Sequence, residues 1–295
     1  MNYTLFHQFI FEIPMEVIRT IPDMRSFVKN ARLSNQVIGL VPTMGALHLG
    51  HMSLVDLSSE QCDLTITTIF VNPTQFNSPE DLANYPSSIN EDLAMLENKQ
   101  VDAVFVPDVK EIYPEDSLLK IQFGYLETIM EGSSRPGHFA GVGMIVSKLF
   151  NITRPDRAYF GQKDLQQLVL IKHLERMLDF GIHIVTVPTV REPDGLAMSS
   201  RNRRLSNEER MIAIKLYQSL KTLQKNIKGG MAIDVAIRNV KRNLQLVNGI
   251  QLDYLEVVDA ITLQKVNHVN ETKEIALCIA AYVGSVRLLD NILLN

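Results

Sequence analysis

The sequence lacks the features that would place this protein in a membrane or on nucleic acid. No stretch approaches the roughly 18 consecutive apolar residues of a membrane-spanning helix. Lysine and arginine total 29 against 33 aspartate and glutamate residues, so the formal net charge is -4. A general nucleic-acid binder needs a strong positive field. We therefore expect neither a membrane nor a nucleic acid as a partner.

Cysteine is also scarce, because the chain contains only Cys62 and Cys278. The two lie too far apart for a metal or redox motif, and Cys278 sits in an apolar run. Both are predicted to be buried thiols in a reducing compartment, so we expect a cytoplasmic protein. Residues 1–14 lack a basic start and a small-residue cleavage site, and therefore predict no signal peptide.

The composition that remains is that of an ordinary globular protein, with 46% apolar and 21% charged residues. In the first two thirds, strand-like and helix-like segments alternate. This pattern predicts an α/β fold with a Rossmann-like parallel sheet and helices on both faces. The predicted strands are 16–19, 37–41, 64–71, 102–106, 156–160 and 182–187. The predicted helices are 23–34, 50–61, 89–98, 139–152 and 164–180.

The character of the sequence changes after Pro188. A polar, arginine-rich loop at 189–205 precedes two predicted helices and three β-like runs, the last two joined by the tight turn Gly284-Ser285. The helices are predicted at 206–227 and 231–247, and the strands at 252–258, 275–283 and 286–289. We predict a Rossmann-like domain over residues 1–188 and a smaller α+β domain over residues 189–295, hinged near residue 189.

The segment Pro42–His51 is the most informative part of the chain. It follows a buried strand, turns at Gly45 and brings two histidines, His48 and His51, to the start of a helix. Residues three apart share a helix face, and a helix N-terminus favours anions, so phosphate is a suitable ligand. Taken alone, the pair is equally compatible with two surface histidines, or less often with a metal pair that would need further ligands.

A second polar segment, residues 192–202, presents two hydroxyls and a guanidinium in succession. Ser199, Ser200 and Arg201 are good donors for a polyphosphate. The alternative is a polar interdomain loop. Asp164 likewise has two interpretations, because with Gln167 it resembles a capping box at the start of helix 164–180. Gly181 is predicted as the C-terminal cap of that helix.

Five segments in this order resemble the pantothenate synthetase (pantoate–β-alanine ligase) family, within the nucleotidylyltransferase superfamily. They are residues 42–51, 70–76, 135–142, 161–167 and 196–202. The resemblance runs from about Met15 to the end of the chain. It implies that ATP, accompanied by Mg²⁺, adenylates (R)-pantoate with release of pyrophosphate. β-Alanine then attacks the acyl adenylate, giving pantothenate, a coenzyme A precursor, and AMP.

The same resemblance implies roles for individual residues of this sequence. Catalytic roles fall to His48, His51, Lys163 and Arg201, with His51 at the position usually assigned as proton donor. The loop implied to bind ATP comprises Met44, Gly45, Ala46, Leu47, His48, Leu49, Gly50 and His51. Further ATP contacts are implied for Gly161, Gln162, Lys163, Asp164, Val190, Met198, Ser199, Ser200 and Arg201.

The resemblance also implies that Gln75 and Gln167 hold pantoate, and that Gln75 lies near β-alanine. Arg135 and His138 are predicted as wall residues of the site. Glu91 and Asp92 are predicted near the metal–phosphate region, although no metal ligand is identified. Family members usually have an acidic residue at Gln162, whose side chain is expected to face away from the chemistry.

Other expectations concern assembly, the chain start and competing functions. The resemblance implies a homodimer joined through the nucleotide-binding domains. The natural chain is hypothesised to begin at Met15, which an intact mass that includes residues 1–14 would refute. A tRNA-charging synthetase fragment is disfavoured, because residues 192–202 lack the lysines that such synthetases usually have there and because no large anticodon-binding domain remains. A catalytically silent nucleotide sensor stays open.

Overall fold

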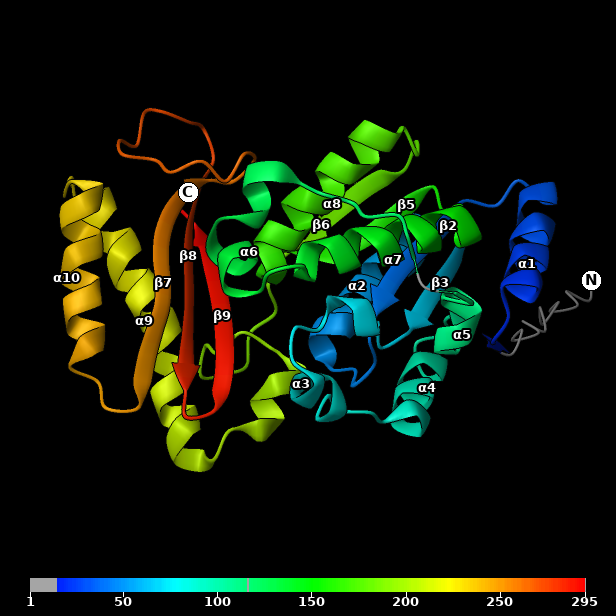
Figure 1. Ribbon diagram of the computed structural model, residues 1–295, viewed down its shortest axis with the longest axis horizontal. Coiled ribbons are helices and arrows are strands. Elements are labelled where there is room, and N and C mark those ends of the chain that lie inside the picture. Colours follow the sequence, from blue (N-terminus) through cyan, green and yellow to red (C-terminus); the bar gives the residue numbers. More distant parts are fainter. Residues whose placement is uncertain (1–14, 116, 295) are drawn as a thin grey trace, which may run out of the picture.

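The computed structural model describes residues 15–115 and 117–294. Their larger sheet has six parallel strands in the order β1-β4-β3-β2-β5-β6. Figure 1 labels β2, β3, β5 and β6 of this sheet. The predicted Rossmann-like sheet is confirmed, and the hypothesis about residues 1–14 lies outside the described residues. The strands are β1 (Glu16–Ile18), β2 (Ile38–Thr43), β3 (Leu64–Ile69), β4 (Ala103–Phe105), β5 (Arg157–Gly161) and β6 (His183–Val187).

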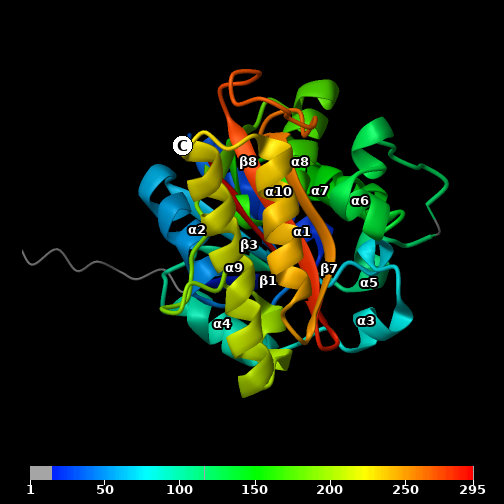
Figure 2. The same cartoon turned by 90° about the vertical axis from the view of Figure 1, so that its left-hand side faces the viewer.

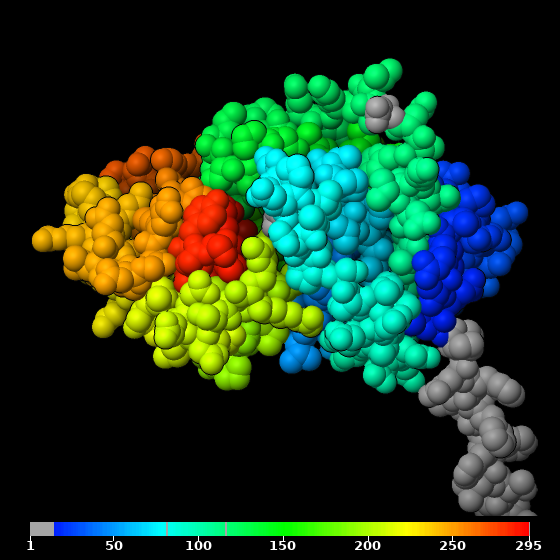
Figure 3. All heavy atoms as spheres, turned by 60° about the horizontal axis from the view of Figure 1, so that its bottom comes forward, coloured from blue at the N-terminus to red at the C-terminus, as the bar shows by residue number. Residues whose placement is uncertain are grey.

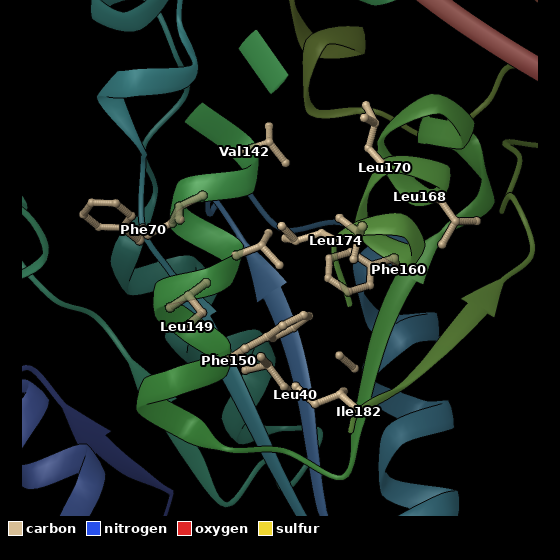
Figure 4. Packing of buried hydrophobic residues seen from close by; sticks show 14 of the residues in the cluster. Leu40, Phe70, Val142, Leu149, Phe150, Phe160, Leu168, Leu170, Leu174 and Ile182 are labelled. Atoms are coloured by element: carbon tan, nitrogen blue, oxygen red, sulfur yellow. The ribbon is translucent and has the colours of Figure 1, made fainter. Parts of the chain in front are cut away.

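Helices cover both faces of this sheet because its strands are apolar on both sides. Leu40 and Phe160 pack with α1, α7 and α8, whereas the adjacent Val41 and Tyr159 pack with α2 and α4. Figure 4 shows Phe150 of α7 facing Phe160, with ring centroids 6.5 Å apart. The helices are α1 (Ile21–Leu33), α2 (Leu49–Gln61), α4 (Ile89–Glu97), α7 (His138–Thr153) and α8 (Leu165–Leu178).

The last third forms a second, antiparallel sheet, as predicted. Its strands are β7 (Ile250–Asp259), β8 (Ile275–Val283) and β9 (Val286–Leu293), and Val283 pairs with Val286 across the predicted two-residue turn. α9 (Asn207–Lys228) and α10 (Ile233–Gln245) lie side by side on its outer face (Figure 2). Ser206 and Glu209 form a capping box that starts α9.

A buried ionic cluster joins a short helix to the second sheet. Glu131 of α6 (Met130–Ser134) accepts two hydrogen bonds from Arg287 of β9, at 2.7 and 2.8 Å, and one from the Tyr254 hydroxyl at 2.8 Å. The Arg287 and Glu131 side chains are only 15% and 9% exposed. Removing Arg287 would leave the buried Glu131 carboxylate without a cation, whereas Arg287 also pairs with Asp253 at 2.6 Å. The Glu131–Arg287 pair therefore fixes α6 against the second sheet.

Several local predictions were wrong. The left-handed residue that ends α8 is Asp179 (φ 48°), whose N–H donates to the Glu175 carbonyl, and Gly181 lies two residues further. A short polar residue tolerates this conformation, so glycine was not required. Asp164 precedes α8 but makes no capping hydrogen bond with its side chain. Cys62 is half-buried rather than buried, whereas Cys278 is buried as predicted.

Three short helices escaped prediction because four or five residues are too few to show a helical period. They are α3 (Pro79–Ala83), α5 (Val109–Ile112) and α6. Strand β9 extends four residues beyond its predicted end at residue 289. Within the part of the chain that the structure describes, none of the helices combines the length and apolar character that a membrane span requires.

Helix α7 approaches the segment after β3 so closely that Gly141 has no room for a side chain. A Cβ there would lie 2.4 Å from the Thr74 carbonyl oxygen and 2.7 Å from the Gln75 nitrogen. Gly143, on the same helix, would instead meet the ring of Phe123 at 2.9 Å. A side-chain ring can shift, whereas a backbone held by both its neighbours cannot.

We therefore predict that Gly141→Ala lowers the free energy of unfolding by about 1–3 kcal/mol, the usual cost of overpacking. Gly143→Ala is the matched control, because both variants gain the same helix propensity. Urea denaturation of the two variants measures the difference. Equal stability of the two would contradict the close contact at Gly141.

Candidate active site

The loop between β2 and α2 is held from behind by Asp92. Gly45 (φ 79°) and Ala46 (φ 50°) both adopt left-handed conformations. The buried Asp92 carboxylate accepts the N–H groups of Ala46 and Leu47, each at 2.8 Å. A Cβ on Gly45 would lie 2.9 Å from the same carboxylate. The loop therefore has one conformation, set by a carboxylate and by the absence of a side chain.

The two histidines pack against each other at the start of α2. Their ring centroids are 4.0 Å apart, and Nδ1 of His48 accepts the N–H of Gly50 at 3.1 Å. This bond leaves the N–H of a neutral His48 ring on Nε2. Among the described residues, Nδ1 of His51 has no hydrogen-bond partner.

Both histidines are uncharged at neutral pH. Burial, assisted by Lys163 and Arg203, lowers the pKa of His48 to about 4. Burial and the adjacent His48 lower the pKa of His51 to about 3. Neutral imidazoles donate hydrogen bonds to an anion but contribute no positive charge, so any cation at this site must come from elsewhere.

The helix end itself offers fewer free donors than the sequence suggested. The N–H of Gly50 is bound to His48 Nδ1, and those of His51 and Met52 donate to the His48 carbonyl. The N–H groups of Gly50 and His51 are therefore not free to bind an anion. Side chains must provide most of the donors.

Lys163 and Asp164 lie opposite the histidines, in the 3-10 turn Gln162–Asp164 that follows β5. The Lys163 ammonium is 3.7 Å from the Asp164 carboxylate. Burial alone would raise the pKa of Asp164, but Lys163 and Arg201 outweigh it and lower that pKa. The carboxylate is therefore ionised, and 47% of its side chain is open to the cleft.

A third group of polar side chains surrounds Gln75. Its Oε1 accepts from Asn72 at 3.0 Å, and its Nε2 lies 3.0 Å from the Met44 sulfur. The His138 ring bonds the Gln75 carbonyl at 2.8 Å and Arg135 at 3.1 Å. Burial and Arg135 lower the pKa of His138 to about 4, so this neutral ring donates from Nδ1 and accepts from Arg135.

The second polar segment and the turn that follows it contact the loop between β2 and α2. Arg203 donates to the Leu47 carbonyl at 3.5 Å, and a Cβ on Gly50 would lie 3.4 Å from that of Met198. Ser199 accepts the N–H of Arg201 and caps the 3-10 turn Ser200–Arg204. Two segments about 150 residues apart in sequence thus touch in space.

These groups surround one cavity of about 230 Å³. A wider cleft of about 520 Å³ adjoins it, and both are bordered by Arg135, Lys163, Ser199 and Arg201. Figure 3 shows the surface there, where the segment near residue 80 faces the segments near residues 200 and 285. The predicted residues that line the smaller cavity are Met44, His48, Gly50, His51, Gln75, Arg135, His138, Gly161, Lys163, Asp164, Gln167, Val190, Met198, Ser199, Ser200 and Arg201.

The other predicted residues lie outside the lining. Gly45, Ala46 and Leu47 are buried behind it, and Leu49 is 63% exposed. The Gln162 side chain bonds Asn291 at 3.4 Å and so faces away, as expected. The structure locates all these residues, and their individual binding roles stay predictions.

Sequence reasoning missed how Asp92 is used. It placed Glu91 and Asp92 near metal and phosphate. Asp92 is only 1% exposed, however, and its carboxylate accepts hydrogen bonds from the loop and from the Ser88 hydroxyl. Glu91 is exposed. The only sequence signal was a pair of acidic residues in the first turn of a helix, which does not distinguish a loop anchor from a metal ligand.

Asp92→Ala would leave two buried N–H groups without an acceptor, each costing about 1–3 kcal/mol. We expect the free energy of unfolding to fall by about 2–5 kcal/mol, as measured by urea denaturation. The neighbouring Glu91→Ala, an exposed control, should cost less than about 1 kcal/mol. Similar losses from the two variants would show that Asp92 does not anchor the loop.

Known proteins match this chain over nearly its whole length. The family model described as pantoate-beta-alanine ligase matches residues 16–293. A pantothenate synthetase from Bacteroides fragilis is 45% identical over 278 residues, which cover 94% of this chain and 98% of the relative.

Solved structures of proteins from the same family also resemble this chain. The crystal structure of pantothenate synthetase from Thermus thermophilus has a TM-score of 0.88 and 38% identity, covering 94% of this chain and 99% of that one. The pantoate-beta-alanine ligase from Francisella tularensis, in complex with beta-gamma ATP and beta-alanine, has a TM-score of 0.79 and 37% identity, covering 95% and 98% of the two chains. The chain therefore belongs to the pantoate–β-alanine ligase family.

Proposed function

We propose that this protein condenses (R)-pantoate with β-alanine to form pantothenate, at the expense of ATP. In the first step a pantoate carboxylate oxygen attacks the α-phosphorus of ATP, and pyrophosphate leaves. In the second step the β-alanine amine attacks the acyl carbon of pantoyl adenylate, AMP leaves, and the amine loses a proton. The observation that carries the proposal is the contact between residues 44–51 and residues 198–203 around one cavity.

The charge distribution of the cavity suits the first step. Departing pyrophosphate concentrates negative charge, and Lys163 and Arg201 border the cavity as cations while the two histidines remain neutral. We infer that His48 and His51 donate hydrogen bonds to phosphate oxygens. Fixed donors in a partly buried site stabilise the developing charge without having to reorganise.

The remaining polar groups suit the other parts of the substrates. Asp164 is ionised and open to the cavity, so we infer that it accepts hydrogen bonds from the ribose hydroxyls. Gln75 and Gln167 border the same cavity, and we infer that they hold pantoate. Val190 is placed by this proposal beside adenine, and Ser199 and Ser200 beside the triphosphate.

Magnesium enters the proposal as a companion of ATP. Within residues 15–115 and 117–294, no group of three or more histidine, cysteine, aspartate or glutamate side chains is arranged to hold a metal ion. Asp92, which the sequence placed near metal and phosphate, is committed to the loop. We therefore infer that phosphate oxygens and water supply most Mg²⁺ ligands, as this cation often requires.

Three broader properties are part of the same proposal. We infer a domain boundary near residue 189, with the C-terminal domain acting as a lid over ATP. We also propose a homodimer, joined through the nucleotide-binding domains, and a cytoplasmic location. Pantoate, β-alanine and ATP are the partners proposed for the site itself.

Exchange of labelled pyrophosphate into ATP tests the reaction. We expect exchange that depends on pantoate and not on an amino acid, because only pantoate forms the adenylate. Exchange that required an amino acid instead would indicate a tRNA-charging synthetase. No exchange with any carboxylate, despite binding of ATP, would indicate a nucleotide sensor.

His51→Ala in the same assay tests the proposed use of the histidine pair. Loss of a donor to the leaving pyrophosphate should slow pantoate-dependent exchange by on the order of 10²-fold or more. His183→Ala removes an exposed histidine and serves as the matched control. A near-normal rate for His51→Ala would remove His51 from the mechanism.

A further inference from the structure

The segment that carries Lys163 is held by a residue of the other sheet. Asn291, on β9, donates both hydrogens of its side-chain amide to main-chain oxygens, at 3.0 Å to Gln162 and 2.7 Å to Lys163. Its Oδ1 accepts from the Gln162 side chain at 3.4 Å. Asn291 is 3% exposed, so water has little access to replace these bonds.

Asn291 is in turn fixed by an ion pair. Its own N–H donates to Asp290 at 2.7 Å, and Asp290 forms a two-fold bond with Arg191 at 2.7 and 2.9 Å. The Arg191 guanidinium lies 3.9 Å from the centre of the Tyr217 ring and also donates to the Asn291 carbonyl at 3.2 Å. Such a planar, doubly bonded arginine allows little rotation.

The same arginine contacts the second polar segment, residues 192–202. Arg191 pairs with Ala197 in an isolated β-bridge and donates to the Gly195 carbonyl at 3.1 Å. A continuous set of hydrogen bonds, mostly part-buried, thus runs from the Arg191–Ala197 bridge, through Asp290 and Asn291, to the backbone of Lys163. None of these bonds uses the Lys163 ammonium, which stays available to the cavity.

We propose that Asn291 is a positioning residue for Lys163, and that the Arg191–Asp290 pair holds Asn291 in place. The inference rests on the role assigned to Lys163 in the proposed function. Without the amide, two carbonyls lose their donors and the turn Gln162–Asp164 is free to shift. A displacement of about 1 Å at a reacting group is enough to cost on the order of 10²-fold in rate.

A double-mutant cycle tests this directly, with the rate of pantoate-dependent pyrophosphate exchange as the readout. We expect Lys163→Ala to slow exchange by about 10²-fold or more, and Asn291→Ala by about 10- to 100-fold, mainly through kcat rather than the KM for ATP. In the Lys163→Ala background, Asn291→Ala should cost less than about 3-fold, because the group that it positions is already gone.

Two further variants of Asn291 separate an effect on the position of Lys163 from an effect on folding. Asn291→Asp keeps the volume but removes both donors, so it should be as slow as Asn291→Ala. Asn291→Ser retains one donor and should recover part of the rate, and it replaces the alanine variant in the cycle if that variant does not fold. Asn248→Ala, at an exposed position of the same domain, should leave the rate unchanged.

The possible failures are distinguishable. A normal rate for Lys163→Ala would overturn the assigned role of Lys163 and hence the proposed chemistry of the site. A slow Lys163→Ala with a normal Asn291→Asp would overturn only the positioning role. Equal losses from the Asn291 variant in both backgrounds would also overturn it, because they would reflect a general structural defect.

Discussion

The active-site geometry depends on buried side chains that bind main-chain groups at the carboxyl edge of the parallel sheet. Loops at this edge leave N–H and carbonyl groups that no strand or helix satisfies. Asp92 accepts two such N–H groups in the loop before α2, and Asn291 donates to two such carbonyls in the turn after β5. Because buried polar groups are costly without partners, each side chain fixes the position of a segment that borders the cavity.

This arrangement separates the task of holding the loops from the task of binding the substrate. Asp92 and Asn291 are almost fully buried and face the backbone, whereas His48, Lys163 and Arg201 face the cavity. Burial keeps the histidines neutral, so the positive charge comes from lysine and arginine. In the proposed reaction, Lys163 and Arg201 therefore supply the positive charge for the polyphosphate, and the adjacent imidazoles carry no positive charges that would repel each other. The Glu131–Arg287 pair keeps the second sheet next to this edge.

Much of the fold was predictable from local sequence patterns. The strands, the longer helices and the Gly284-Ser285 turn follow from periodicity and turn chemistry, which act over a few residues. The ordered motifs also predicted which polar residues would share a cleft. The anchors were not predictable in the same way. Asp92 lies 46 residues from Ala46, and Asn291 lies 128 residues from Lys163, so no short-range pattern connects them. Asp92 was predicted near metal because an acidic pair at the start of a helix can either bind a metal or anchor a loop.

The central claim is that segments distant in the sequence bind one nucleotide together. Hydrogen–deuterium exchange, followed by mass spectrometry with and without Mg-ATP, tests it most directly. We predict slower exchange at the same time in residues 44–51, in residues 161–164 and in residues 198–204. Protection of only one of these segments at a saturating ATP concentration would contradict the account.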